Sequence, residues 1–160
     1  MNIMIIDAQG GGIGKQLVAA LKQQLPDTHI LAVGTNTTAT MAMLKAGADQ
    51  AATGENAVIV GCRTADVIVG PIGIVIADSL LGEVTPQMAL AVAQSRAVRV
   101  LIPFNHCDNI IAGIPDTGTG ALIQAAILEI RRYTAKTASG TAGDSARSGT
   151  RIRCPGDSAI

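Results

Sequence analysis

Aromatic residues are almost absent from this chain, which has one Phe, one Tyr and no Trp. Hydrophobic residues nevertheless make up 48% of its 160 residues and charged residues only 15%, a balance typical of a folded protein and not of a disordered one. The core must therefore be built from Ile, Val, Leu, Ala and Met. The length suits a single domain.

Net charge, long apolar runs and paired cysteines are also missing. The formal net charge is zero, so no overall field attracts nucleic acid or anionic lipid. No apolar run reaches ~18 residues, which argues against a membrane-spanning helix. Cys62, Cys107 and Cys154 lie far apart, and their odd number argues against a secreted disulfide framework. Because no basic segment precedes the first apolar strand, we predict no signal peptide and a cytoplasmic location.

Strand and helix signals alternate from residue 2 to residue 133. The predicted strands are 2–6, 29–33, 50–52, 67–69 and 98–102, and the predicted helices are 12–24, 38–46, 55–62, 74–81, 86–94 and 120–133. This alternation predicts an α/β fold with a Rossmann-like, doubly wound parallel sheet of about five strands in three α/β/α layers. Residues 1–133 form this domain. Residues 134–160, rich in Thr, Ala, Ser, Gly and Arg, are predicted to be a disordered low-complexity tail.

One predicted helix has an unusual composition. Residues 74–81 are apolar almost all round, and a helix of that kind must be covered on more than one side. We therefore expect a subunit interface there, most simply in a two-fold homodimer.

The glycine-rich turn after the first predicted strand is the most informative segment. Glycines let a backbone turn sharply and approach a ligand, and a helix that starts there points free N–H groups at it. That arrangement suits a phosphate or another anion. The residues expected to bind it are Gln9, Gly10, Gly11, Gly12, Ile13, Gly14 and Lys15.

Polar residues also follow the other predicted strands, where ligands of open α/β sheets bind. Asp7, Thr35 and Asn36 are expected to contact the sugar or base of a nucleotide. Gly70, Pro71 and Gly73 are expected to form the floor of the pocket. If the chain is an enzyme, Asp7 and Glu55 are the acid/base candidates by position. For Glu83 two interpretations stay open, a solvated turn residue or a carboxylate that approaches the pocket.

The polar loop that contains His106, Cys107 and Asp108 suggests a metal site or a thiolate nucleophile. Adjacent residues rarely converge on one metal or pair as nucleophile and base, so we predict an ordinary loop and no metal.

The glycine turn matches no known nucleotide motif completely. The Gly-x-Gly-x-x-Gly pattern fails at Lys15, and no acidic residue for an adenosine ribose follows the second strand, which weakens NAD. The short-chain dehydrogenase pattern fits at Gly12-Ile13-Gly14, but Ala8 replaces its first glycine and its Tyr-x-x-x-Lys pair is missing. A phosphate loop needs Ser or Thr after the lysine, where this chain has Gln16. The alternative is that the glycines serve only to pack the helix against the sheet.

Six ordered segments carry a resemblance to a known family. They are Gly-Gly-Gly-Ile-Gly (10–14), Gly-Thr-Asn (34–36), Ala-Gly-Ala-Asp (46–49), Thr-Gly-Glu-Asn-Ala (53–57), Gly-Pro-Ile-Gly-Ile (70–74) and Leu-Gly-Glu-Val-Thr-Pro (81–86). With them the chain resembles an uncharacterised bacterial family, chiefly of clostridia-type organisms, that is known as domain of unknown function 3842. The resemblance covers residues 1–133, departs from the family at Ala8, and implies the fold but no activity.

The expected function is binding of a nucleotide or a phosphorylated small molecule at the glycine-rich turn. One alternative is a non-enzymatic regulatory or scaffold homodimer, and another is a small reductase that uses NADP. Neither nucleic acid nor a membrane is expected as a partner. The sequence does not identify the ligand, the reaction or the pathway.

Overall fold

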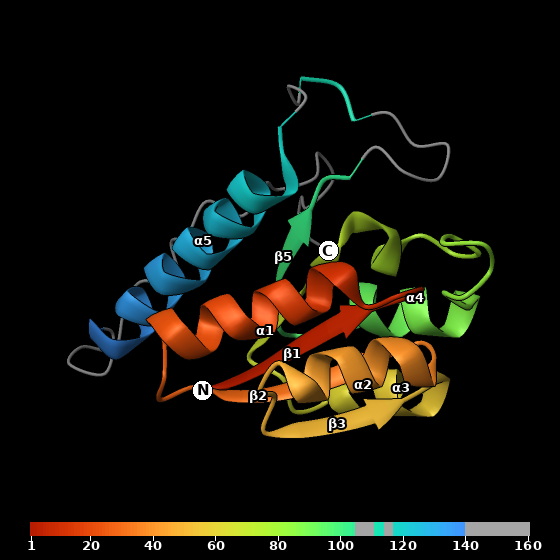
Figure 1. Cartoon of the computed structure of the whole chain (residues 1–160), viewed down its shortest axis with the longest axis horizontal. Helices are drawn as coiled ribbons and strands as arrows, with labels where there is room; N and C mark the ends of the chain where they lie inside the picture. Colours follow the sequence, from red (N-terminus) through yellow and green to blue (C-terminus); the bar gives the residue numbers. More distant parts are fainter. Residues whose placement is uncertain (105–110, 114–116, 140–160) are drawn as a thin grey trace, which may run out of the picture.

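The computed structural model describes residues 1–104, 111–113 and 117–139. At its centre is a parallel sheet of five strands (Figure 1). The strands are β1 (Asn2–Asp7), β2 (His29–Gly34), β3 (Gln50–Thr53), β4 (Val67–Pro71) and β5 (Val98–Ile102). Their order is β3-β2-β1-β4-β5, so the chain runs outward from β1 and then returns to its other side. This is the strand order of a Rossmann-like α/β fold, and the predicted fold class is confirmed.

Helices cover both faces of the sheet (Figure 1). They are α1 (Gly12–Gln24), α2 (Thr37–Lys45), α3 (Glu55–Gly61), α4 (Pro86–Gln94) and α5 (Thr119–Ser139), with a short 3₁₀ turn, η1 (Ile72–Val75), after β4. Side chains of α1, α2 and α5 pack against one face, and those of α3, η1 and α4 against the other. Alternate residues of β1 point to opposite faces, so Ile3 joins the first core and Met4 the second.

The cores hold aliphatic side chains, as the composition requires. Leu17 and Leu21 of α1 are fully buried, as are Ile68 of β4 and Val92 of α4. Burying a side chain of this size contributes about 1.5–3 kcal/mol before chain entropy is subtracted. The short apolar β4 is buried along its whole length because helices lie on both of its faces.

The predicted helix over residues 74–81 is wrong. After η1 the chain forms a series of turns, in which Asp78, Leu80 and Leu81 have φ angles of 61°, 55° and 60°. The β-branched run at 74–76 has low helix propensity. The backbone N–H of Asp78 donates to the carbonyl of Val84 at 2.8 Å, which closes a turn instead of a helix. The homodimer was predicted from this helix, so it now lacks that support and stays a prediction.

The other element boundaries agree with the sequence to within about two residues, except at the end of α5. This helix continues to Ser139, beyond the predicted domain end at residue 133. The predicted loop around His106 and Cys107 lies outside the described residues. So do residues 140–160 of the tail predicted over 134–160, whereas its residues 134–139 belong to α5. Within the part of the chain that the structure describes, no helix is both long and apolar enough to cross a membrane.

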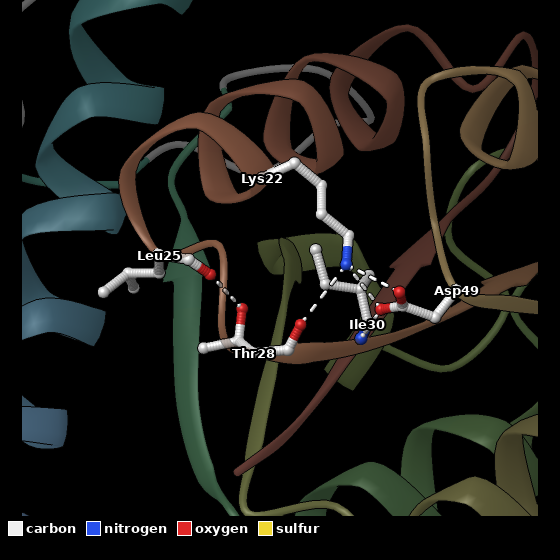
Figure 2. Close-up of polar contacts among 5 residues, drawn as sticks. All are labelled: Lys22, Leu25, Thr28, Ile30 and Asp49. Carbon is white, nitrogen blue, oxygen red and sulfur yellow. Dashed lines mark hydrogen bonds and ion pairs between the residues drawn. The ribbon is translucent and has the colours of Figure 1, made fainter.

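A polar cluster fastens the end of α1 at the amino edge of the sheet (Figure 2). Lys22 of α1 donates to both carboxylate oxygens of Asp49 at 2.7 Å and to the carbonyl of Thr28 at 3.3 Å. Asp49 also accepts from the backbone N–H of Ile30 at 2.7 Å. The ion pair with Lys22 and the bond from Ile30 lower the pKa of Asp49. The cluster joins α1, the start of β2 and the loop before β3.

Candidate functional site

The carboxyl ends of β1 and β2 bring the predicted binding residues together. Asp7 and Gly34 are paired at the ends of these strands, and the N–H of Thr35 donates to the carbonyl of Asp7 at 3.0 Å. The glycine-rich turn follows β1, and the polar pair Thr35 and Asn36 follows β2. The two turns therefore lie side by side at the carboxyl edge of the sheet, where ligands of open α/β sheets bind. The turn after β1 also borders the point between β1 and β4 where the strand order changes direction.

The carboxylate of Asp7 points under the glycine turn. It accepts from the backbone N–H of Gly14 at 2.6 Å and from that of Ala8 at 2.9 Å, and Asp7 is only 4% exposed. Asp7 thus already occupies one of the free donors at the start of α1. In this position it holds the turn in shape and is not directed toward solvent, where a sugar would lie.

Burial raises the pKa of Asp7, because it disfavours the charged carboxylate. Hydrogen bonds from the backbone N–H groups around Gly14 act in the opposite direction and are the smaller effect. The negative charge of Glu83 adds to the rise.

Two glycines of the turn are required by packing. A Cβ on Gly11 would lie 2.7 Å from the Cα of Ala39 in α2, and its φ angle of 67° is in the left-handed region. A Cβ on Gly14 would overlap the sulfur of Met43 and lie 2.9 Å from the Cβ of Asp7. These contacts explain Gly11 and Gly14 without a ligand.

The other two glycines of the turn are not required by packing. A Cβ on Gly10 or on Gly12 would meet no atom within 4 Å in the described part of the chain, and neither residue has a positive φ angle. Their backbone N–H groups donate no hydrogen bond to any residue that the structure describes. Lys15 follows on the exposed side of α1. Unhindered backbone donors are thus available to an anion beside a lysine.

Glu83, for which the sequence leaves two interpretations open, lies at the site. Its Oε2 accepts from the backbone N–H of Gln9 at 2.9 Å, the hydroxyl of Thr35 at 2.5 Å and the side-chain amide of Asn36 at 2.8 Å. Gln9 has a φ angle of 52°, an uncommon conformation for a residue with a side chain. The carboxylate therefore joins the turn after β1 to the turn after β2.

The charge of Glu83 is stabilised by these bonds. Burial raises the pKa of Glu83, but the hydrogen bonds from Thr35, Gln9 and Asn36 together outweigh it, and the net pKa is lowered. Asn36 also accepts from the N–H of Ala39 at 2.9 Å and so caps α2. One side chain thus holds both the helix start and the Glu83 carboxylate.

The predicted floor residues have packing roles. A Cβ on Gly70 would overlap the carbonyl of Ile6, so β4 can lie against β1 only with glycine there. Gly73 accepts from the hydroxyl of Ser79 at 2.6 Å, and a Cβ on it would lie 3.1 Å from that hydroxyl oxygen. Pro71 is buried. Together they support the turns that carry Glu83.

The second acid/base candidate, Glu55, lies at the start of α3 and is exposed. Its Oε2 accepts from the hydroxyl of Thr85, which in turn caps α4 by accepting from the N–H of Met88 at 3.2 Å. Glu55 is therefore tied to the same chain segment as Glu83. Among residues 1–104, 111–113 and 117–139, no three His, Cys, Asp or Glu side chains come together as a metal site.

A groove of about 480 Å³ lies away from this edge, between α3 and α4. Its lining includes Ile59, Leu90 and the exposed side chains of Arg63 and Arg96. It is open to solvent and lacks the convergent, buried polar groups of the carboxyl edge. The carboxyl edge is therefore the better candidate site.

Comparison with known families decides the relationship of this chain. The family model described as Domain of unknown function (DUF3842) matches residues 2–135. The chain belongs to this family. Membership in DUF3842 agrees with the resemblance of the six sequence segments and does not specify a ligand. No curated protein matches the chain.

Several solved structures are similar to this chain, and two of them illustrate the likeness. One is a dodecameric FMN-dependent UbiX-like decarboxylase from Escherichia coli O157:H7, with 19% identity and a TM-score of 0.43 over 82% of this chain and 75% of that one. Another is a nucleoside-diphosphate-sugar epimerase from Pseudomonas aeruginosa, with 10% identity and a TM-score of 0.40 over 86% of this chain and 49% of that one. Similarity at this level carries no information about the ligand of the DUF3842 chain.

Proposed function

We propose that this DUF3842 protein binds a nucleotide or another phosphorylated small molecule at the carboxyl edge of its sheet. The observation that carries the proposal is the pair Gly10 and Gly12. Both have open space where a side chain would be, and both have unpaired N–H groups in the described structure. Glycine without a packing or conformational reason is expected where another group approaches the backbone closely.

Each part of the edge has a role in this proposal. The N–H groups of Gly10 and Gly12 bind the phosphate, and Lys15 adds a positive charge. Asp7 keeps the turn in shape through Gly14. The turn after β2, with Thr35, lies beside the sugar or base of the ligand. Glu55, which is exposed, stays the acid/base candidate for a reaction of the bound ligand, whereas Asp7 points under the turn and is better suited to hold its shape.

A thermal-shift screen of the purified protein tests the proposal. The panel is NAD, NADP, FAD, ATP, GTP, S-adenosylmethionine and coenzyme A. A ligand at 100 times its dissociation constant stabilises the folded state by about 2.7 kcal/mol, which is readily visible. Gly12→Val should abolish the shift, because the new side chain extends into the open space. Gly120→Val is the matched control, since a Cβ there also meets nothing within 4 Å in the described part, near the start of α5.

The result that contradicts the proposal is equally clear. If no compound shifts the melting temperature, or if Gly12→Val keeps the full shift, the glycine turn is not a phosphate site. Gly11 and Gly14 would then explain the turn by packing alone, and Gly10 and Gly12 would have no role in binding.

A regulatory or scaffold homodimer is the second candidate. Leu81 favours it, because this side chain is 92% exposed in the segment where the sequence predicts an interface. A solvent-exposed Leu flanked by the partly buried Leu80 is suited to contact a second copy. Light scattering on wild-type protein and on Leu81→Ser should then show a dimer and a monomer. Monomeric wild-type protein would rule the dimer out.

A further inference from the structure

We infer that Glu83 determines which sugar the proposed site accepts: its carboxylate takes a hydrogen bond from a free ribose hydroxyl and rejects a ribose that carries a 2′-phosphate. This inference rests on the proposed function. In other dinucleotide-binding sheets, an acidic residue directly after β2 binds the ribose hydroxyl. We assign this role to Glu83, which lies in the turns before α4.

The carboxylate of Glu83 lies where dinucleotide-binding sheets carry an acidic residue. The acidic residue that binds the ribose is expected immediately after β2, where this chain has Thr35 and Asn36 and no Asp or Glu. The structure brings Glu83 to that place from 48 residues further along the chain, in contact with both side chains. A carboxylate therefore stands beside the end of β2 although the local sequence lacks one.

The two oxygens of the Glu83 carboxylate differ in the hydrogen bonds that they accept. Oε2 accepts three hydrogen bonds from donors on two different turns. Oε1 has no hydrogen bond from any residue in the described ranges. One oxygen is thus fixed and the other is left as an acceptor, so the group is oriented before a ligand arrives. A hydroxyl, which can donate, suits that acceptor.

Positively charged side chains are missing from the segment that follows β2. Sites that accept a 2′-phosphate place an Arg near the end of the second strand. Residues 34–44 of this chain contain neither Lys nor Arg. Lys15 is the only Lys or Arg among residues 1–21, and it lies on the phosphate side of the proposed site. A 2′-phosphate would therefore face the charge of Glu83, and neither of these two segments offers it a compensating cation.

Paired ligands test the inference. We expect NAD to bind the wild-type protein about tenfold or more tightly than NADP, by isothermal titration calorimetry, because a hydrogen bond to a charged group is replaced by repulsion. If ATP or GTP is the nucleotide that binds, the corresponding pair is the ribose form against its 2′-deoxy form, with the same direction expected. These comparisons use wild-type protein alone and do not depend on a variant that folds.

Two variants then assign the effect to Glu83. Glu83→Gln removes the charge and should bring the NAD to NADP affinity ratio close to one. Asp78→Asn is the matched control, since it removes a carboxylate from the same turns, and Asn tolerates the left-handed conformation of that position. The control should keep the wild-type ratio.

The outcomes separate the inference from the proposed function. If no nucleotide binds, the proposed function is wrong and the inference falls with it. If nucleotides bind but NADP equals or exceeds NAD, or the 2′-deoxy form equals the ribose form, only the inference is overturned. It is also overturned if Glu83→Gln tightens NAD binding, because Glu83 would then be a group that the ligand has to displace.

Discussion

The glycine turn after β1 contains two pairs of glycines that differ in what surrounds them. Gly11 and Gly14 lie against α2 and against Asp7, so any side chain there would collide with a neighbour. Gly10 and Gly12 face open space and have unpaired N–H groups within the described structure. A comparison with sequence motifs does not distinguish between these four glycines. The geometry separates glycines that build the turn from glycines that a ligand can approach.

Gly14→Val should give the largest effect and thereby test one side of this comparison. The new side chain would collide with the sulfur of Met43 and push Asp7 away from the start of α1. Overpacking of this kind costs about 3 kcal/mol of unfolding free energy. Urea unfolding measures it, with Gly12→Val as the control in the same turn. Equal stability of the two variants would remove the distinction between the glycines.

Gly11→Ala should give the next largest effect. Its Cβ would approach the Cα of Ala39 and its left-handed φ angle is costly for a residue with a side chain, about 1–2 kcal/mol for the conformation alone. Gly10→Ala, its neighbour in open space, should change the unfolding free energy by less than about 0.5 kcal/mol. A thermal melt of both variants checks the order, and a larger loss in Gly10→Ala would reverse the account of the turn.

The elements could be predicted largely from the sequence because local signals mark their ends. The glycine run starts α1, and Pro86 with the Thr85 cap starts α4. Residues 74–81 show the limit of such reasoning. Their apolar pattern suits a helix, but hydrogen bonds between Ser79 and Gly73 and between Asp78 and Val84 fix turns instead. Patterns of side chains do not contain these contacts.

The candidate site could be predicted only in part for the same reason. The turns after β1 and β2 meet because parallel strands end at one edge, and this needs no coordinates. The inward direction of Asp7 depends on its bond to Gly14, and the position of Glu83 depends on contacts across 48 residues with Thr35. For Glu83 the sequence left two interpretations open, and the missing acid after β2 was a further signal that a carboxylate could come from elsewhere in the chain.

The pH dependence of stability should reveal the buried position of Asp7. Because its folded pKa is raised above 3.8, the folded state binds this proton more tightly than the unfolded state. The unfolding free energy of the wild type, relative to Asp7→Asn, should therefore fall as the pH rises from about 4 through the raised pKa. Urea unfolding of both proteins between about pH 4 and 7 measures this. A difference that grows with pH would contradict the buried position.

The ion pair at the other end of α1 should give the smallest effect. Lys22 and Asp49 have side chains that are 25% and 37% exposed, and pairs of this kind contribute about 0.5 kcal/mol. Lys22→Met should cost that amount at neutral pH. Because the folded pKa of Asp49 is lowered, the contribution should disappear as the pH falls below about 3.8. Chemical unfolding at neutral and acidic pH tests this, and a loss that persists in acid would point to packing of the lysine stem.

The central claim is that a nucleotide binds at the open glycines of the carboxyl edge. A titration followed by ¹H–¹⁵N NMR spectra tests it most directly, with the compound that gives the largest thermal shift, or NAD if none does. The account predicts shifts of the amide signals of Gly10, Gly12 and Thr35, with those of Arg63 and Arg96 in the α3–α4 groove unchanged. Shifts confined to the groove, or none at all, would contradict it.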